Sequence, residues 1–147
     1  MFGWIVGAMI RRSVRSLNEG DIQPLLSGYA DDVHFVFHGE SSWAADIHGK
    51  TDLEAWLRRF VEVGLQLEAE DIVVAGWTPW SFTVCMKVTD RAQGPDGDTV
   101  YENKGVIFGK IVWGKIKSYE AFVDTQKVAA FDEYLSAHGL AAEGVLK

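Results

Sequence analysis

The chain has 147 residues, of which 48% are hydrophobic and 24% are charged, and its mean hydropathy is near zero. This composition is typical of one soluble globular domain, so we expect a single domain over residues 1–147. The formal net charge of −7 argues against a nucleic-acid partner, whose phosphates require a basic surface, and against an anionic membrane. A single cysteine, Cys85, excludes intrachain disulfides and cysteine-rich zinc sites and favours a reducing, cytoplasmic location.

The first half of the chain combines helical and extended patterns. An apolar segment predicts a helix over residues 4–17; its apolar run is too short to span a bilayer, and its arginines follow that run rather than precede it, unlike a secretory signal. A short helix capped by Asp21 is expected to run through Tyr29, and the alternating run 33–38 predicts a strand. After a loop over 39–49, an i, i+3, i+4 apolar stripe predicts a third helix with Thr51 and Glu54 as its capping box.

From residue 65 onward the apolar period changes from 3.6 to 2, which is typical of strands. Gly105 and Gly109 lie inside one of these runs and predict bulges or bends that curve the sheet. The order of elements indicates an α+β fold, in which a curved, mostly antiparallel sheet carries helices on one face. The expected strands cover 67–75, 80–90, 100–112 and 115–123, and a last helix runs from Asp124, its N-cap, to about residue 137.

The chain resembles the nuclear transport factor 2-like superfamily, specifically its SnoaL-like and ketosteroid-isomerase-like branch. Each matching segment is largely turn and cap chemistry, and it is their order over nearly the whole chain that carries the resemblance. The resemblance implies a cone-shaped, cystatin-like sheet with the N-terminal helices packed on its concave face, an apolar pocket open at one end, and a homodimer. The matching segments are Leu17–Asp21, Tyr29–Val33, His48–Leu53, Tyr101–Gly105, Trp113–Ile116 and Asp124–Val128.

Proteins of this superfamily include isomerases, dehydratases, epoxide hydrolases, polyketide cyclases and binding modules, so the fold alone does not settle the activity. Steroid isomerases use an aspartate base with a tyrosine and a neutral aspartic acid as donors to the oxyanion. On the matched segments the tyrosine falls on Ser13, the base on Phe37 and the second donor near Val106. Because none of the three is retained, we reject steroid isomerisation by that mechanism.

The histidines offer few sites for chemistry. His34 and His38 would be roughly 13 Å apart along a strand, too far to share a metal ion, and we expect no metal. His38, at the end of the strand, is either a general base at the pocket rim or a hydrogen-bonded strand terminus. Asp46 and His48 could pair only if their loop bends, and are otherwise solvated. No glycine-rich phosphate loop follows a strand, so we expect no nucleotide cofactor.

Glu102 and Tyr119 are the sharper candidates for catalysis. If the even-numbered face of the 100–112 strand points inward, Glu102 is a desolvated carboxylate suited to acid–base work, whereas a shift of one residue places it in solvent. Tyr119 falls on a position that faces the cavity in the resembled enzymes, where a phenol donates to a carbonyl or an oxyanion. It would serve equally well as a core aromatic.

Two functions follow from these residues. The first is a cofactor-independent isomerase, cyclase or dehydratase that binds a small apolar, ring-containing carbonyl compound, with Glu102 or His38 as base and Tyr119 as donor. The second is a non-catalytic module that binds a ligand, a partner or a second copy through its open sheet face. The expected apolar lining of the pocket is Phe35, Phe37, Trp56, Trp80, Phe82, Val84 and Val106.

Overall fold

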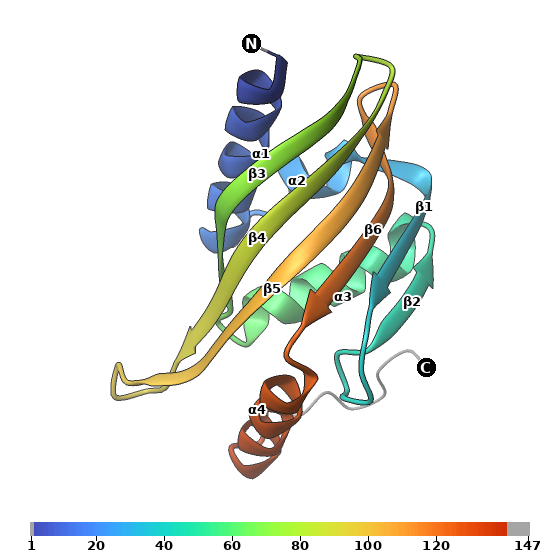
Figure 1. Ribbon diagram of the computed structural model, residues 1–147. Helices are drawn as coiled ribbons and strands as arrows, with labels where there is room; N and C mark the ends of the chain where they lie inside the picture. The colour runs from blue at the N-terminus through green and yellow to red at the C-terminus, as the bar shows by residue number, and fades with distance from the viewer. Residues whose placement is uncertain (1, 141–147) are drawn as a thin grey trace.

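A computed structural model describes residues 2–140, so the predicted domain of 1–147 extends past the described residues at both ends. Among residues 2–140, no helix has an apolar stretch that could cross a bilayer. The elements are α1 (Phe2–Asn18), α2 (Gln23–Gly28), β1 (Tyr29–Phe37), β2 (Ala45–His48), α3 (Lys50–Glu62), β3 (Gln66–Thr78), β4 (Ser81–Gln93), β5 (Thr99–Val112), β6 (Lys115–Val123) and α4 (Thr125–Ala137) (Figure 1).

The six strands form one curved sheet in the order β2-β1-β6-β5-β4-β3. Only the β1–β6 pair is parallel; the other neighbours are antiparallel. Helices α1, α2 and α3 lie on one face of the sheet, and α4 lies at the end where β6 finishes (Figure 1). The predicted α+β class, with a mostly antiparallel sheet and helices on its concave face, is therefore confirmed.

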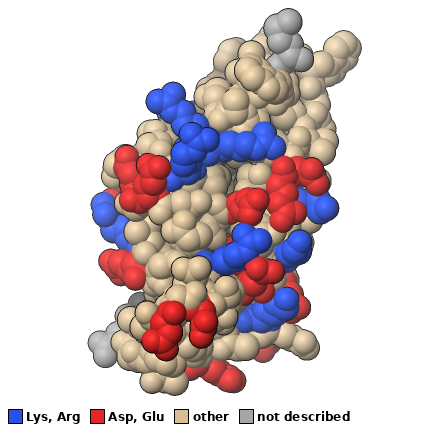
Figure 2. All heavy atoms as spheres, turned by 90° about the vertical axis from the view of Figure 1, so that its left-hand side faces the viewer, with Lys and Arg blue, Asp and Glu red and all other residues tan. Residues whose placement is uncertain are grey.

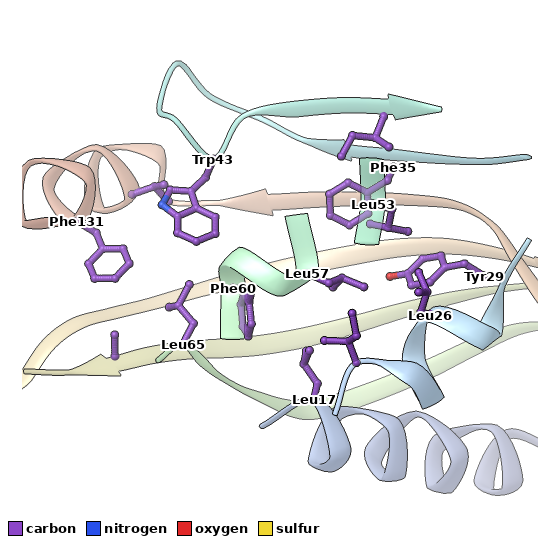
Figure 3. Close-up of a cluster of buried hydrophobic side chains, with 14 of the residues drawn as sticks. Leu17, Leu26, Tyr29, Phe35, Trp43, Leu53, Leu57, Phe60, Leu65 and Phe131 are labelled. Atoms are coloured by element: carbon purple, nitrogen blue, oxygen red, sulfur yellow. The ribbon is translucent and has the colours of Figure 1, made fainter. Parts of the chain in front are cut away.

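Helix α3 crosses the concave face and builds much of the core. Its apolar stripe buries Leu53, Leu57 and Phe60 against the sheet, as predicted. Figure 3 shows these side chains between the strands and α1, with Phe35 of β1 above them. Burying each such side chain stabilises the fold by roughly 1.5–3 kcal/mol.

Three predictions about where helices and loops begin or end are wrong. The expected 39–49 loop contains strand β2, whose four residues are too few for a clear alternation; Ile47 is its buried member. Tyr29 begins β1 rather than ending a helix, because it pairs with Ile116 of β6. Helix α3 starts at Lys50 after Gly49, whose φ of 99° favours glycine, so Thr51 lies inside the first turn and makes no cap.

Gly105 allows β5 and β6 to pack closely and does not form the predicted bulge. The β5–β6 ladder is regular at Gly105 and Gly109, and its irregularity falls between Lys110 and Ile111. A Cβ at Gly105 would lie 2.5 Å from the backbone oxygen of Phe122. Any side chain there would therefore push β6 away from β5. The N-cap predicted for the last helix is confirmed, because the Asp124 side chain accepts from the backbone N–H groups of Gln126 and Lys127.

Candidate functional site

A cavity of about 330 Å³ lies between the concave face of the sheet and helices α1 to α3. Its size is at the lower end of the range typical for small-molecule sites. Apolar side chains from all three helices and from five of the six strands form the wall. Among the described residues that line the cavity, Asp90 is the only one with a charged side chain.

The cavity opens at the end of the molecule where α1 begins. Ile5 and Met9 of α1 line it and are 46% and 65% exposed, and Pro79 of the β3–β4 turn lines it too. Figure 2 shows that this end carries a cap without charged side chains above a band of lysines and arginines. Trp77 near the end of β3 and Trp113 in the β5–β6 turn are also exposed. On the face seen in Figure 2, this end of the molecule is therefore largely apolar.

Aromatic rings form the central wall of the cavity. The Phe35 ring stacks on that of Tyr119, with centroids 4.6 Å apart and planes 12° apart. Trp56 of α3 packs against both Phe35, at 4.9 Å, and Phe37, at 5.5 Å. These rings are held by neighbours on both sides, so they offer a preformed surface to a flat ligand.

Asp90 is the charged group of this wall, and it is held by a short network. It lies on β4 and is 8% exposed. The Tyr101 hydroxyl donates to Asp90 Oδ2 at 2.9 Å, and the Asn103 amide donates to the Tyr101 oxygen at 3.1 Å. The same amide donates to the backbone oxygen of Asp124 at 2.9 Å, which fixes its orientation. Asp90 Oδ1 is buried without a hydrogen-bond partner among residues 2–140.

Burial raises the pKa of Asp90 to about 6, although the Tyr101 hydroxyl partly opposes this by stabilising the carboxylate. A carboxyl group with such a pKa exchanges its proton near neutral pH, as a general acid or base must. A backbone N–H also opposes the rise. The site therefore holds one carboxylate that is able to take a proton from a bound molecule.

Two phenols share the cavity with Asp90. Tyr29 and Tyr119 both line it, with their ring centroids 6.3 Å apart. Burial raises the pKa of Tyr119 well above its ordinary value, and the ionised forms of Tyr29 and Asp90 would raise it further. Burial also raises the pKa of Tyr29. Both hydroxyls therefore stay protonated and are able to donate hydrogen bonds.

Comparison with known proteins identifies the family. The profile of the SnoaL-like domain matches residues 10–119. The chain belongs to the SnoaL-like domain family. No curated protein sequence matches it significantly.

Solved structures with the same fold resemble this SnoaL-like domain. A Xanthomonas campestris protein with a cystatin-like fold is 21% identical, with 84% of this chain and 95% of that chain covered and a TM-score of 0.65. A candidate polyketide cyclase from Xanthomonas campestris pv. campestris is 18% identical, with 88% and 98% covered and a TM-score of 0.63. TerC, co-crystallised with polyporic acid, is 21% identical, with 88% and 96% covered and a TM-score of 0.63. At these identities the likeness establishes the cystatin-like fold.

Six of the predicted site residues line the cavity of the SnoaL-like domain. They come from β1, α3, β4 and β6, and their inward faces follow the alternation that the sequence predicts. Ser13 and Phe37 also lie on the cavity wall, at the positions where steroid isomerases carry the donor tyrosine and the base. This chain therefore has a serine and a phenylalanine in place of those two catalytic groups. The six residues are Phe35, Phe37, Trp56, Phe82, Val84 and Tyr119.

The other four predicted residues lie outside the cavity. Glu102 and Val106 point away because the odd-numbered face of β5, with Tyr101 and Ile107, is the buried one. Arg91 Nε donates to Glu102 at 2.7 Å and lowers its pKa, the opposite of the predicted raised value. His38 hydrogen-bonds to Glu120 at 2.7 Å on the outer face. Trp80 precedes β4 and is 51% exposed.

Asp90 is the site residue that the sequence analysis missed. The alternation of β4 places Phe82, Val84, Met86 and Val88 on one face, and Asp90 is the next member of that series. A carboxylate on an otherwise apolar strand face is the pattern that could have found it. Because the expected strand ends at residue 90, Asp90 resembles a strand terminus and not a member of the apolar face.

Proposed function

We propose that the cavity binds a small apolar, ring-containing carbonyl compound and that Asp90 moves a proton on it. The observation that carries the proposal is a single buried carboxylate, with its pKa raised to about 6, in a wall whose described residues include no other charged side chain. The reaction class is that of a cofactor-independent isomerase, cyclase or dehydratase. Asp90 takes the role that the sequence analysis gave to Glu102 or His38.

The proposed step is proton abstraction next to a carbonyl group. The Asp90 carboxylate takes the proton from carbon, the C–H electron pair forms a carbon–carbon double bond, and the carbonyl π electrons move to oxygen. Tyr119 or Tyr29 donates a hydrogen bond to the enolate oxygen, which lowers the barrier because charge develops there. Asp90 then returns the proton at the same or another carbon, and no oxidant is consumed. Tyr101 and Asn103 act as positioning residues, since they orient the carboxylate without touching the substrate.

The co-crystallisation of TerC with polyporic acid and the candidate polyketide cyclase among the similar structures are consistent with this class of ligand. The stacked Phe35 and Tyr119 rings favour a flat molecule, and the cavity volume of about 330 Å³ limits it to a few fused or linked rings. The runner-up function is a binding module that uses the same cavity without proton transfer.

Native mass spectrometry of freshly purified protein tests whether the cavity takes a ligand. We expect a bound small molecule that is released on denaturation. Ala121, which is 2% exposed and lines the cavity, provides a blocking variant: Ala121→Leu fills space and should remove the added mass. The control is Glu120→Leu, which introduces leucine at the preceding position, on the outer face of the sheet. This variant should retain the bound ligand. A ligand that survives Ala121→Leu would place binding elsewhere.

The outer face of the sheet supports self-association. Phe108 and Phe122 are 49% and 48% exposed there, and Cys85 and Val106 lie beside them in register. We expect a homodimer by sedimentation velocity, because two such faces together would remove these rings from water. Phe108→Lys should shift the protein to monomer. Trp77→Lys, which changes a ring that is 95% exposed at the cavity end, should leave the dimer intact; dissociation by both variants would argue against this face.

A further inference from the structure

Two histidines and an aspartate converge on the outer face at the β2 edge of the sheet. His34 of β1 lies directly opposite His48 of β2 in the antiparallel register. Asp46 is two residues before His48 and so lies on the same face of β2. All three side chains are exposed, by 45% for His34, 71% for His48 and 69% for Asp46. They are separated from the cavity by the thickness of the sheet.

The three side chains place their potential metal-ligand atoms close together. His34 Nε2 lies 2.6 Å and His48 Nε2 lies 3.4 Å from the same oxygen, Asp46 Oδ1. The two imidazole rings are stacked, with centroids 4.2 Å apart and planes 13° apart. One donor atom from each residue lies within 4.8 Å of the others. Both rings thus present the same nitrogen toward the same carboxylate oxygen.

This donor set has the chemistry of a transition-metal site. Imidazole nitrogens and carboxylate oxygens bind zinc at about 2.0–2.2 Å, so atoms that share one ion lie roughly 3–3.5 Å apart. The observed distances from the two histidine nitrogens to the Asp46 oxygen are near this range. Because the side chains are exposed, they can move enough to reach it. Two imidazoles favour borderline ions such as zinc and copper over calcium or magnesium, which prefer oxygen ligands.

His34 meets a different histidine from the one that its spacing along the chain suggests. His34 and His38 are four residues apart on one strand, and His38 instead bonds to Glu120. The partner of His34 comes from β2, a strand that the sequence did not predict. Because cross-strand neighbours are about 5 Å apart, whereas residues four apart on a strand are roughly 13 Å apart, only the cross-strand pair is close enough to share an ion.

We propose that His34, Asp46 and His48 bind one divalent transition-metal ion of the zinc or copper class, with the remaining coordination positions open to solvent. Such an ion would link the edge strand β2 to β1 through side chains as well as through the backbone ladder. The site is independent of the cavity and of Asp90, so its presence or absence leaves the proposed catalysis unaffected.

The test uses the untagged full chain and metal alone as the probe. We expect isothermal titration with Zn²⁺ to give one saturable site of micromolar affinity, and the electron paramagnetic resonance spectrum with Cu²⁺ to show coordination by two nitrogens. His34→Gln and His48→Gln should each weaken binding by at least about tenfold, and Asp46→Asn should weaken it as well.

His38→Gln and His138→Gln are the matched controls, because both remove an exposed histidine outside the cluster. We expect both to bind like the parent protein. Zinc should also raise the midpoint of thermal unfolding in the parent and in His38→Gln but not in His48→Gln. Absence of saturable binding, or an equal loss in His38→Gln and His34→Gln, would overturn the proposal.

Discussion

Replacing Asp90 with asparagine is expected to reduce proton transfer on a bound ketone by about 10²- to 10⁴-fold, the usual contribution of a general base. Asparagine keeps the shape of the side chain and an oxygen for the Tyr101 hydroxyl, but it cannot accept a proton. Exchange of solvent deuterium into the carbon next to the carbonyl measures the step directly. A suitable first substrate is 1-tetralone, a flat bicyclic ketone, with the exchange followed by proton NMR.

Glu102→Gln and His38→Gln are the matched controls for this experiment. Both residues are titratable and were candidates from the sequence, but both lie on the outer face. We expect their exchange rates to equal that of the parent. If Asp90→Asn retains the parent rate while either control loses it, Asp90 is not the base. If the parent catalyses no exchange on any cyclic ketone that binds, the binding-module function is favoured.

The pH dependence separates the base from its positioning residue. For the parent, the rate should rise through a midpoint near pH 6 as the Asp90 carboxyl ionises. The Tyr101 hydroxyl lowers the Asp90 pKa by donating to the carboxylate, so Tyr101→Phe should move that midpoint to higher pH. A residue with a merely structural role would lower the rate without moving the midpoint.

Most of the fold followed from the sequence because the long strands and amphipathic helices have strong periodic patterns. Strand β6 has its predicted bounds, and α3 buries its predicted stripe. Short elements were missed, since the four residues of β2 carry one buried side chain, Ile47, and no clear period. The cone shape and the pocket came from the family resemblance and not from periodicity.

The site was harder to predict because it depends on register. A strand with apolar residues on both faces, such as β5, does not tell which face is inward, and a shift of one residue exchanges Glu102 for Tyr101. The answer lies in tertiary contacts: Tyr101 and Asn103 are buried because they hold Asp90 and the start of α4. Where one face is clearly apolar, as in β4, the expected residues Phe82 and Val84 lie on the cavity wall.

Asparagine at position 90 is also expected to stabilise the folded protein at neutral pH. The folded-state pKa of Asp90, about 6, exceeds its ordinary value of 3.8, so folding favours the protonated form. The stability due to this group is fully present below pH 4 and is lost as the pH rises through 6. A difference of about two pKa units corresponds to about 3 kcal/mol. Relative to the parent, Asp90→Asn should therefore gain about 3 kcal/mol between pH 4 and pH 7.

Urea unfolding of both proteins at a series of pH values measures this gain as a difference, in which contributions from the other carboxyl groups cancel. Glu102→Gln is the control with the opposite sign. Arg91 lowers the Glu102 pKa, so Glu102 stabilises the fold above its ordinary pKa and ceases to do so in acid. That variant should therefore lose stability relative to the parent as the pH rises. A difference between Asp90→Asn and the parent that stays constant from pH 4 to 7 would mean that Asp90 ionises normally.

Loss of turnover together with a gain in stability is the result expected of a carboxylate that the fold keeps buried for its chemistry, because a purely structural aspartate would lose stability when replaced.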